Sequence, residues 1–175
     1  NKYSRRRDVR VLNLNQNNIS SLPENAFEGF EKLEKLHLFE NHLHSVHQNA
    51  FHGLRNLTFL GLGGANVGAG ENQLQLTAET LAPLVSLERL DLSENDLTAI
   101  PDWVNNLGNL KELDLENNRL RLTAGTFVSF PLLEQVDLDD NQLETLPVGV
   151  FSSLHNLKKV FLDYNHFSPE EQERI

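Results

Sequence analysis

The sequence predicts an α/β solenoid of seven coils, with a parallel β-sheet on its concave side and irregular or short-helical segments on its convex side. The first observation is the motif L-x-x-L-x-L-x-x-N-x-L, which starts at residues 9, 33, 57, 87, 110, 133 and 157. Six of these seven copies carry the whole motif, with Val, Ile or Phe replacing some of the Leu residues. The second observation is that the remainder of each repeat is also similar, as residues 22–30 and 46–54 show. A fixed period of this length is typical of stacked structural repeats.

The L-x-L segment of each motif predicts a short strand, because alternate residues of a strand point to the same side. The Asn of the motif is expected where the chain turns inward, since its side-chain amide can donate to the backbone of one coil and accept from the backbone of another. Six residues occupy this position: Asn17, Asn41, Asn95, Asn118, Asn141 and Asn165. One repeat cannot bury its own apolar face, so the coils must stabilise one another through neighbour contacts.

The third repeat is longer than the others and predicts an insertion at about residues 63–71. The step to the next motif is 30 residues, against 23 or 24 elsewhere. Ala65 stands at the motif position, and an Asn followed by x-Leu returns at Asn72. In the alternative alignment Asn66 takes the motif role after a one-residue bulge, and the insertion is 68–74. Insertions in solenoids form loops that often lie near a binding face.

The glycines of this repeat do not match a nucleotide-binding motif. No Lys followed by Ser or Thr completes a P-loop, and no third glycine completes a dinucleotide-binding pattern. Gly61, Gly63 and Gly64 instead occupy successive outward positions at the strand. We therefore expect a dent in the concave face there, flanked by Phe39 and Asp91.

The C-terminal residues 168–175 predict the start of a capping helix. Ser168 suits the N-cap, Pro169 the first helical position, and Glu171 completes a capping box. A terminal coil of a solenoid needs such a cover. We interpret the whole chain, 1–175, as a single domain.

Composition excludes several classes of function. The formal net charge of −10 leaves no surplus of cations for neutralising phosphates, so nucleic acid is not expected as a partner. The chain has no Cys and no apolar run long enough to insert into a membrane. Five of the seven histidines fall within 37–52 but are expected to point in different directions, so no metal site is predicted. No acid, base and nucleophile converge, and we expect neither enzymatic activity nor a cofactor.

The outward positions of the predicted strands give the candidate binding site. Carboxylates fill these positions in repeats four to seven and predict docking of a basic partner: Asp91, Asp114, Glu116, Asp137, Asp139 and Asp140. Aromatic side chains on both sides of them predict apolar anchors: His37, Phe39, Phe59 and Tyr164. Two alternatives stay open, namely that the carboxylates are merely solvated, and that the aromatic rings are covered by the terminal cap or by the inserted loop.

The repeats resemble those of leucine-rich-repeat proteins over residues 9–167, which implies a horseshoe-shaped solenoid. The absence of Cys and the ending "NHFSPEEQERI" are most similar to exported leucine-rich-repeat proteins of bacterial pathogens, including spirochaetes. The resemblance implies non-enzymatic recognition of a protein on the concave sheet, by a secreted or surface protein. It further implies a role in adhesion or virulence, with a host surface or matrix protein as the partner.

Two other hypotheses belong to different classes. One is an intracellular or structural scaffold without a dedicated exposed site, which would place the chain in the cytoplasm. The other is calcium-dependent self-association through the carboxylates, since calcium prefers oxygen ligands.

Overall fold

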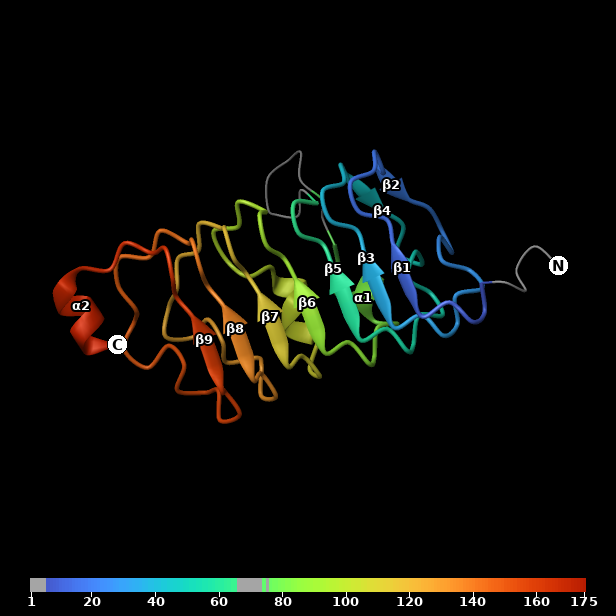
Figure 1. Cartoon of the computed structure of the whole chain (residues 1–175). Coiled ribbons are helices and arrows are strands. Elements are labelled where there is room, and N and C mark those ends of the chain that lie inside the picture. The colour runs from blue at the N-terminus through green and yellow to red at the C-terminus, as the bar shows by residue number, and fades with distance from the viewer. Residues whose placement is uncertain (1–5, 66–73, 75) are drawn as a thin grey trace.

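The computed structural model describes residues 6–65, 74 and 76–175, which form an elongated solenoid with a sheet along one side (Figure 1). Seven strands pair in parallel in the order β1-β3-β5-β6-β7-β8-β9, and each comes from one repeat. Their bounds are β1 Val11–Asn13, β3 Lys35–His37, β5 Phe59–Gly61, β6 Arg89–Asp91, β7 Glu112–Asp114, β8 Gln135–Asp137 and β9 Lys159–Phe161. The predicted solenoid with a parallel sheet is confirmed.

The register of the sheet follows the sequence repeat without slippage. Each central strand residue pairs with its counterpart in the next coil, in the order Leu12, Leu36, Leu60, Leu90, Leu113, Val136 and Val160. Equivalent outward residues therefore form straight rows across the strands, about 5 Å apart from one strand to the next. These rows decide which side chains of the concave face become neighbours.

The opposite side of the solenoid has less regular structure. Strands β2 (Ser21–Leu22) and β4 (Ser45–Val46) form a two-stranded parallel sheet. The third and fourth repeats contribute helix α1 (Ala78–Leu81) and the 3-10 helix η1 (Asp102–Asn106), and α2 (Pro169–Arg174) follows the last coil (Figure 1). Within the described residues, no helix is long and apolar enough to cross a bilayer.

The core runs the length of the solenoid between these two sides. The motif leucines of the internal coils are fully buried; Leu36, Leu60 and Leu115 are all 0% exposed. Phe rings fill the convex half of the core and stack in pairs, Phe27 on Phe51 and Phe127 on Phe151. The cohesion between coils is thus apolar and dispersed along the chain, as expected for a repeat protein.

The motif amides link adjacent coils, as predicted. The Nδ2 group of Asn118 donates to Leu92 O of the preceding coil (3.0 Å) and to Leu115 O of its own coil (2.9 Å). Its Oδ1 atom accepts from the backbone N–H groups of Asn95 (3.2 Å) and Leu97 (2.8 Å). Because Asn118 is only 2% exposed, these bonds satisfy backbone groups that water cannot reach.

The third repeat follows the backbone pattern of the other repeats as far as Ala65, which is further than the sequence suggests. The N–H of Gly64 donates to Ser93 O at 2.9 Å, and its φ of 58° matches the left-handed residue of every other coil. Ala65 is fully buried at the position of the motif amide. Gly63 to Ala65 therefore belong to the regular ladder and not to the predicted insertion of 63–71. The remainder of that prediction, and the alternative at Asn66, lie outside the described residues.

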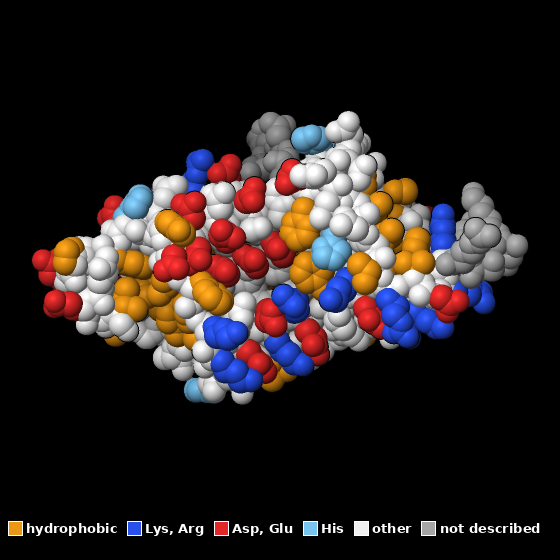
Figure 2. All heavy atoms as spheres, viewed as in Figure 1, with side chains coloured by type: hydrophobic (Ala, Val, Ile, Leu, Met, Phe, Trp, Pro, Cys, Tyr) orange, Lys and Arg blue, Asp and Glu red, His pale blue; other side chains and the backbone are white. Residues whose placement is uncertain are grey.

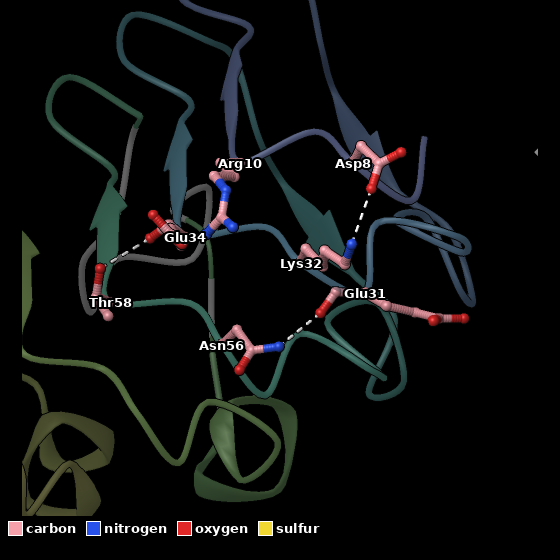
Figure 3. A network of polar contacts seen from close by, with 7 residues as sticks. All are labelled: Asp8, Arg10, Glu31, Lys32, Glu34, Asn56 and Thr58. Carbon is pink, nitrogen blue, oxygen red and sulfur yellow. Dashed lines mark hydrogen bonds and ion pairs between the residues drawn. The ribbon is translucent and has the colours of Figure 1, made fainter. Parts of the chain in front are cut away.

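Polar contacts join successive coils along the side of the sheet where its strands begin (Figure 3). Arg10 pairs with Glu34, and Lys32 pairs with Asp8 at 2.8 Å. The hydroxyl of Thr58 donates to Glu34 O at 3.1 Å. The same side continues with Lys111–Glu88 and Lys158–Glu134, each at 2.7 Å. Exposed pairs of this kind add little stability individually, but their alternation disfavours a shifted register.

Helix α2 closes the last coil at the place where the sequence predicts a capping helix. The Ser168 hydroxyl accepts from Glu171 N at 3.2 Å, which caps the first turn. The Glu171 carboxylate accepts from Leu146 N at 2.8 Å, and Arg174 donates to Leu146 O at 2.5 Å. These two side chains therefore satisfy both backbone groups of Leu146.

Candidate functional site

The concave sheet presents a dense gathering of carboxylates. Figure 2 shows Asp and Glu side chains massed in the middle of this face, over the strands β6 to β8, with hydrophobic and His side chains beside them toward β5 and β3. The sheet supplies these side chains because every second strand residue points away from the core.

An aromatic cluster, formed by His37, Phe39 and Phe59, lies on β3 and β5. The His37 ring centroid is 4.7 Å from that of Phe59 and 5.8 Å from that of Phe39, and the two Phe rings are 6.3 Å apart. The Arg89 guanidinium lies 5.8 Å from the Phe59 centroid, within reach of a cation–π contact. All three rings are half-buried, so each keeps part of its surface available to a partner.

Phe39 fills the dent that the glycines were expected to leave. A Cβ atom on Gly61 would lie 2.5 Å from Cζ of Phe39, and one on Gly63 would lie 2.7 Å from both Cδ1 of Phe39 and Oγ of Ser93. The prediction of an open depression was wrong because the neighbouring ring lies across both glycines. The glycines are thus needed to seat Phe39 against the sheet.

Burial affects the titration of the cluster. Partial burial lowers the pKa of His37, and the nearby Lys35 lowers it further, while Asp91 acts in the opposite direction. The imidazole of His37 is therefore held neutral at physiological pH, which favours its packing against the two Phe rings.

An acidic row, formed by Asp91, Asp114 and Asp137, crosses β6, β7 and β8 at register-paired positions. One carboxylate oxygen of each residue has a structural task. It accepts a hydrogen bond from the backbone N–H two residues later, at 2.9 Å for Asp91, 3.0 Å for Asp114 and 3.1 Å for Asp137. The sequence interpretation missed this role, although an Asp before a turn is the signal for it.

Two coils without Asp or Asn at this position use another acceptor. Phe39 N donates to Oδ1 of Asn15 in the preceding coil at 2.9 Å, and Asp163 N donates to Oδ1 of Asp139 in the preceding coil at 2.6 Å. Asp139 therefore also stabilises the fold, beyond the partner-binding role predicted for it.

The acidic row concentrates charge in a partly dehydrated place. Burial is the main reason that the pKa of Asp114 rises to about 7, and Asp91, Asp137 and Glu116 raise it further; the hydrogen bond from Glu116 N partly opposes them. The pKa values of Glu116 and Asp139 are raised by the same two causes, burial first and neighbouring carboxylates second. The fold holds these carboxylates together at an electrostatic cost.

A small hollow of about 60 Å³ joins the aromatic cluster to the acidic row. Its lining includes Phe59, all three residues of the acidic row and an ion pair in which Arg89 Nε lies 2.8 Å from Oε2 of Glu112. The complete lining is Phe59, Arg89, Leu90, Asp91, Glu112, Leu113, Asp114, Gln135 and Asp137. It is large enough for the end of one side chain, not for a drug-sized ligand.

Comparison with known families decides the class of the protein. The family described as "Leucine rich repeat" matches residues 7–67, 71–120 and 120–167. The chain belongs to the leucine-rich-repeat family. No curated protein matches the sequence significantly.

Solved leucine-rich-repeat structures are similar over almost the whole chain. A structure of TLR13 in complex with the single-stranded RNA ssRNA13 has 29% identity and a TM-score of 0.71, covering 93% of this chain and 23% of TLR13. A leucine-rich-repeat protein of Leptospira interrogans has 25% identity and a TM-score of 0.61, covering 94% of this chain and 51% of that protein. In the Toll–Spätzle complex of Drosophila the identity is 20%, the TM-score 0.62 and the coverage 93% and 27%, a likeness of fold alone. The chain thus spans between about a quarter and half of these proteins.

The leucine-rich-repeat fold brings most of the predicted site residues together. The aromatic cluster and the acidic row are neighbours, since β5 pairs with β6. Asp140 and Tyr164 are set apart, because each occupies the left-handed turn position after its strand, with φ of 51° and 56°. Tyr164 is 83% exposed, so it is not covered by α2. It belongs to a separate, distal part of the concave surface.

The described part of this leucine-rich-repeat chain contains no group of three or more His, Asp or Glu side chains arranged to hold a metal ion. The residues of the acidic row occupy register-paired positions on three neighbouring strands. Leucine-rich-repeat proteins are generally non-enzymatic recognition modules, and the geometry on this face is that of an extended surface.

Proposed function

We propose that this protein recognises a protein partner on its concave sheet. The partner places a basic side chain over the acidic row and an apolar side chain against the aromatic cluster. The observation that carries this proposal is the adjacency of half-buried aromatic rings and in-register carboxylates on one unpartnered sheet face. Exposed apolar surface beside concentrated charge supports binding more than either feature alone.

The electrostatic state of the acidic row supports a cationic partner. A carboxyl with a pKa near 7 is one whose charge is disfavoured in the free protein. A Lys or Arg of the partner would relieve the repulsion among Asp91, Asp114 and Asp137. By linkage, binding near pH 7 should then release protons, mainly from Asp114.

The charge of the concave face distinguishes a protein partner from a nucleic acid. TLR13 was solved with single-stranded RNA. Here the central positions of the face are occupied by Asp and Glu, which repel phosphates. We therefore extend only the general recognition role of the family to this chain.

The experiment is a capture of extracellular proteins with the wild-type chain, followed by association kinetics with each captured partner. The test variant combines Asp114→Asn, Asp137→Asn and Asp139→Asn. Asparagine removes the charge but keeps the oxygen that accepts the backbone N–H groups, so the turns are retained. We expect the association rate to fall about tenfold at low salt and less at high salt.

A matched control carries Glu144→Gln, which neutralises an exposed carboxylate outside the strands of the concave sheet. It should associate like the wild type. Equal rates for the triple variant and the wild type at low salt would refute the proposed site, whatever the partner. Capture of a partner that binds through an acidic surface would also refute the proposed site.

Location at the cell surface and a role in adhesion stay part of the proposal. The likeness to a Leptospira interrogans leucine-rich-repeat protein is consistent with the bacterial type expected from the sequence. Protease treatment of intact source cells measures the location, since only surface-exposed protein is digested.

A further inference from the structure

A second groove lies on the convex side, between α1 and η1, away from the concave sheet. Its volume is about 530 Å³, within the range of sites that bind ligands or short segments. It is lined by Ala78, Glu79, Leu81, Ala82, Leu84, Val85, Leu87, Asn106, Leu107, Gly108 and Asn109. The third repeat provides one wall and the fourth repeat the other.

The groove opens where the stacking of Phe rings along the convex core is interrupted. In repeats one and two, and again in five and six, the rings stack in pairs with centroids 5.9 and 5.6 Å apart. Repeats three and four carry the smaller Leu81 and Val104 at the equivalent positions. Leu81 lines the groove itself. The fourth repeat is also one residue shorter here and forms a 3-10 helix, so its convex segment does not match that of its neighbour.

The lining combines apolar side chains with polar groups, among them Asn106 and Asn109, and carries a single charge. Val85 lines the groove and is 59% exposed, so its side chain is available to an occupant. Glu79 is the one charged side chain among the described lining residues. The wall is held in place because the Asn109 amide donates to Val85 O at 2.8 Å. A groove that presents apolar side chains and one carboxylate favours an occupant that has an apolar part and bears a cation.

We propose that the groove between α1 and η1 is a second docking site, which binds a short apolar segment of a partner protein carrying a Lys or Arg opposite Glu79. This groove is independent of the concave site, because no residue that lines it belongs to the aromatic cluster or to the acidic row. The protein can therefore hold two protein segments at once.

Two glycines allow a matched test of this site. A Cβ atom on Gly108 meets no atom within 4 Å, so Gly108→Phe can place a ring in the groove without displacing the wall. Gly125 is similarly open, with only Thr123 Oγ1 at 3.9 Å, and lies in the next coil, outside this groove. Gly125→Phe is thus the control. For the charge, Glu79→Lys is compared with Glu144→Lys, a substitution elsewhere on the exposed surface.

The probe is a library of short random peptides, selected on the wild-type chain in the presence of excess soluble Gly108→Phe protein. We expect selected peptides to combine apolar residues with Lys or Arg. Their affinity should fall at least about tenfold for Gly108→Phe and for Glu79→Lys, and not for either control. Binding should also change the fluorescence of Trp103, the single Trp of the chain, which lies in η1.

The concave variant with Asp114→Asn, Asp137→Asn and Asp139→Asn should bind the selected peptides as tightly as the wild type. The proposal is overturned if no peptide is enriched, if the enriched peptides are acidic, or if they bind Glu79→Lys and wild-type protein equally. None of these results depends on whether the concave site binds a partner.

Discussion

Neutralising Asp114 should stabilise the folded protein at and above neutral pH and leave its stability unchanged below about pH 4. The folded-state pKa of Asp114 is about 7, against an ordinary 3.8. Because the folded chain holds this proton more tightly than the unfolded chain, its contribution to stability is present below about pH 4. That contribution is lost as the pH rises toward about 7.

The magnitude follows from the pKa difference of about 3. At about 1.4 kcal/mol for each pKa unit, the full difference corresponds to roughly 4 kcal/mol. Asp114 is half-buried and shares its repulsion with Asp91 and Asp137, so part of that energy is screened or redistributed when one member is neutralised. We expect Asp114→Asn to raise the free energy of unfolding at pH 8 by about 2 kcal/mol.

The assay is urea denaturation of the wild type and Asp114→Asn at several pH values between 5 and 8. Asparagine keeps the acceptor for Glu116 N, so the turn after β7 should remain. The wild type should lose stability relative to the variant across this range. Curves for the two proteins that stay parallel from pH 5 to 8 would refute the reasoning, and so would a variant less stable at pH 8. Glu144→Gln serves as the control for a generic loss of negative charge.

Three further substitutions test how the coils are held together. Gly61→Ala should displace the Phe39 ring and lower the free energy of unfolding by about 1–2 kcal/mol. Gly108→Ala is the control, because a Cβ atom there has open space, and it should change the free energy of unfolding by less than about 0.5 kcal/mol. Equal effects of the two substitutions in urea titrations would argue against the packing described. Asn118→Ala leaves two buried backbone N–H groups without acceptors and should cost about 3 kcal/mol, measured the same way; a loss below about 1 kcal/mol would contradict this. Glu171→Ala should lower the melting temperature and accelerate amide exchange of Leu146, while Glu171→Gln should have a much smaller effect on both. Arg174 and the backbone hydrogen bond from Leu146 lower the pKa of Glu171. The stabilisation by Glu171 should therefore be lost as the pH falls through that lowered pKa.

The repeated part of the structure could be predicted from the sequence because it is local and additive. A motif that places apolar residues at fixed spacing fixes the strand, its inward face and its register with the next copy. The positions of the motif amides, and the rows that contain Asp91, Asp114 and Asp137, follow from alignment of the repeats alone.

What the sequence could not decide is how side chains of one coil use the space left by another. Phe39 lies over Gly61 and Gly63, so the expected dent is closed by a ring that alignment places in a different coil. The same holds for the convex groove, which opens where Leu81 replaces a stacked Phe. Both depend on packing in three dimensions, which varies with the size of each neighbour and not with the period of the repeat.

The charge of the acidic row shows the same division. The sequence by itself determined that carboxylates would line up on one face, because the register follows the motif. Only the tertiary structure decided that Asp114 is dehydrated between two others while one oxygen of each is committed to a turn. Composition counts charges, whereas burial and the distances between neighbouring strands determine their pKa values.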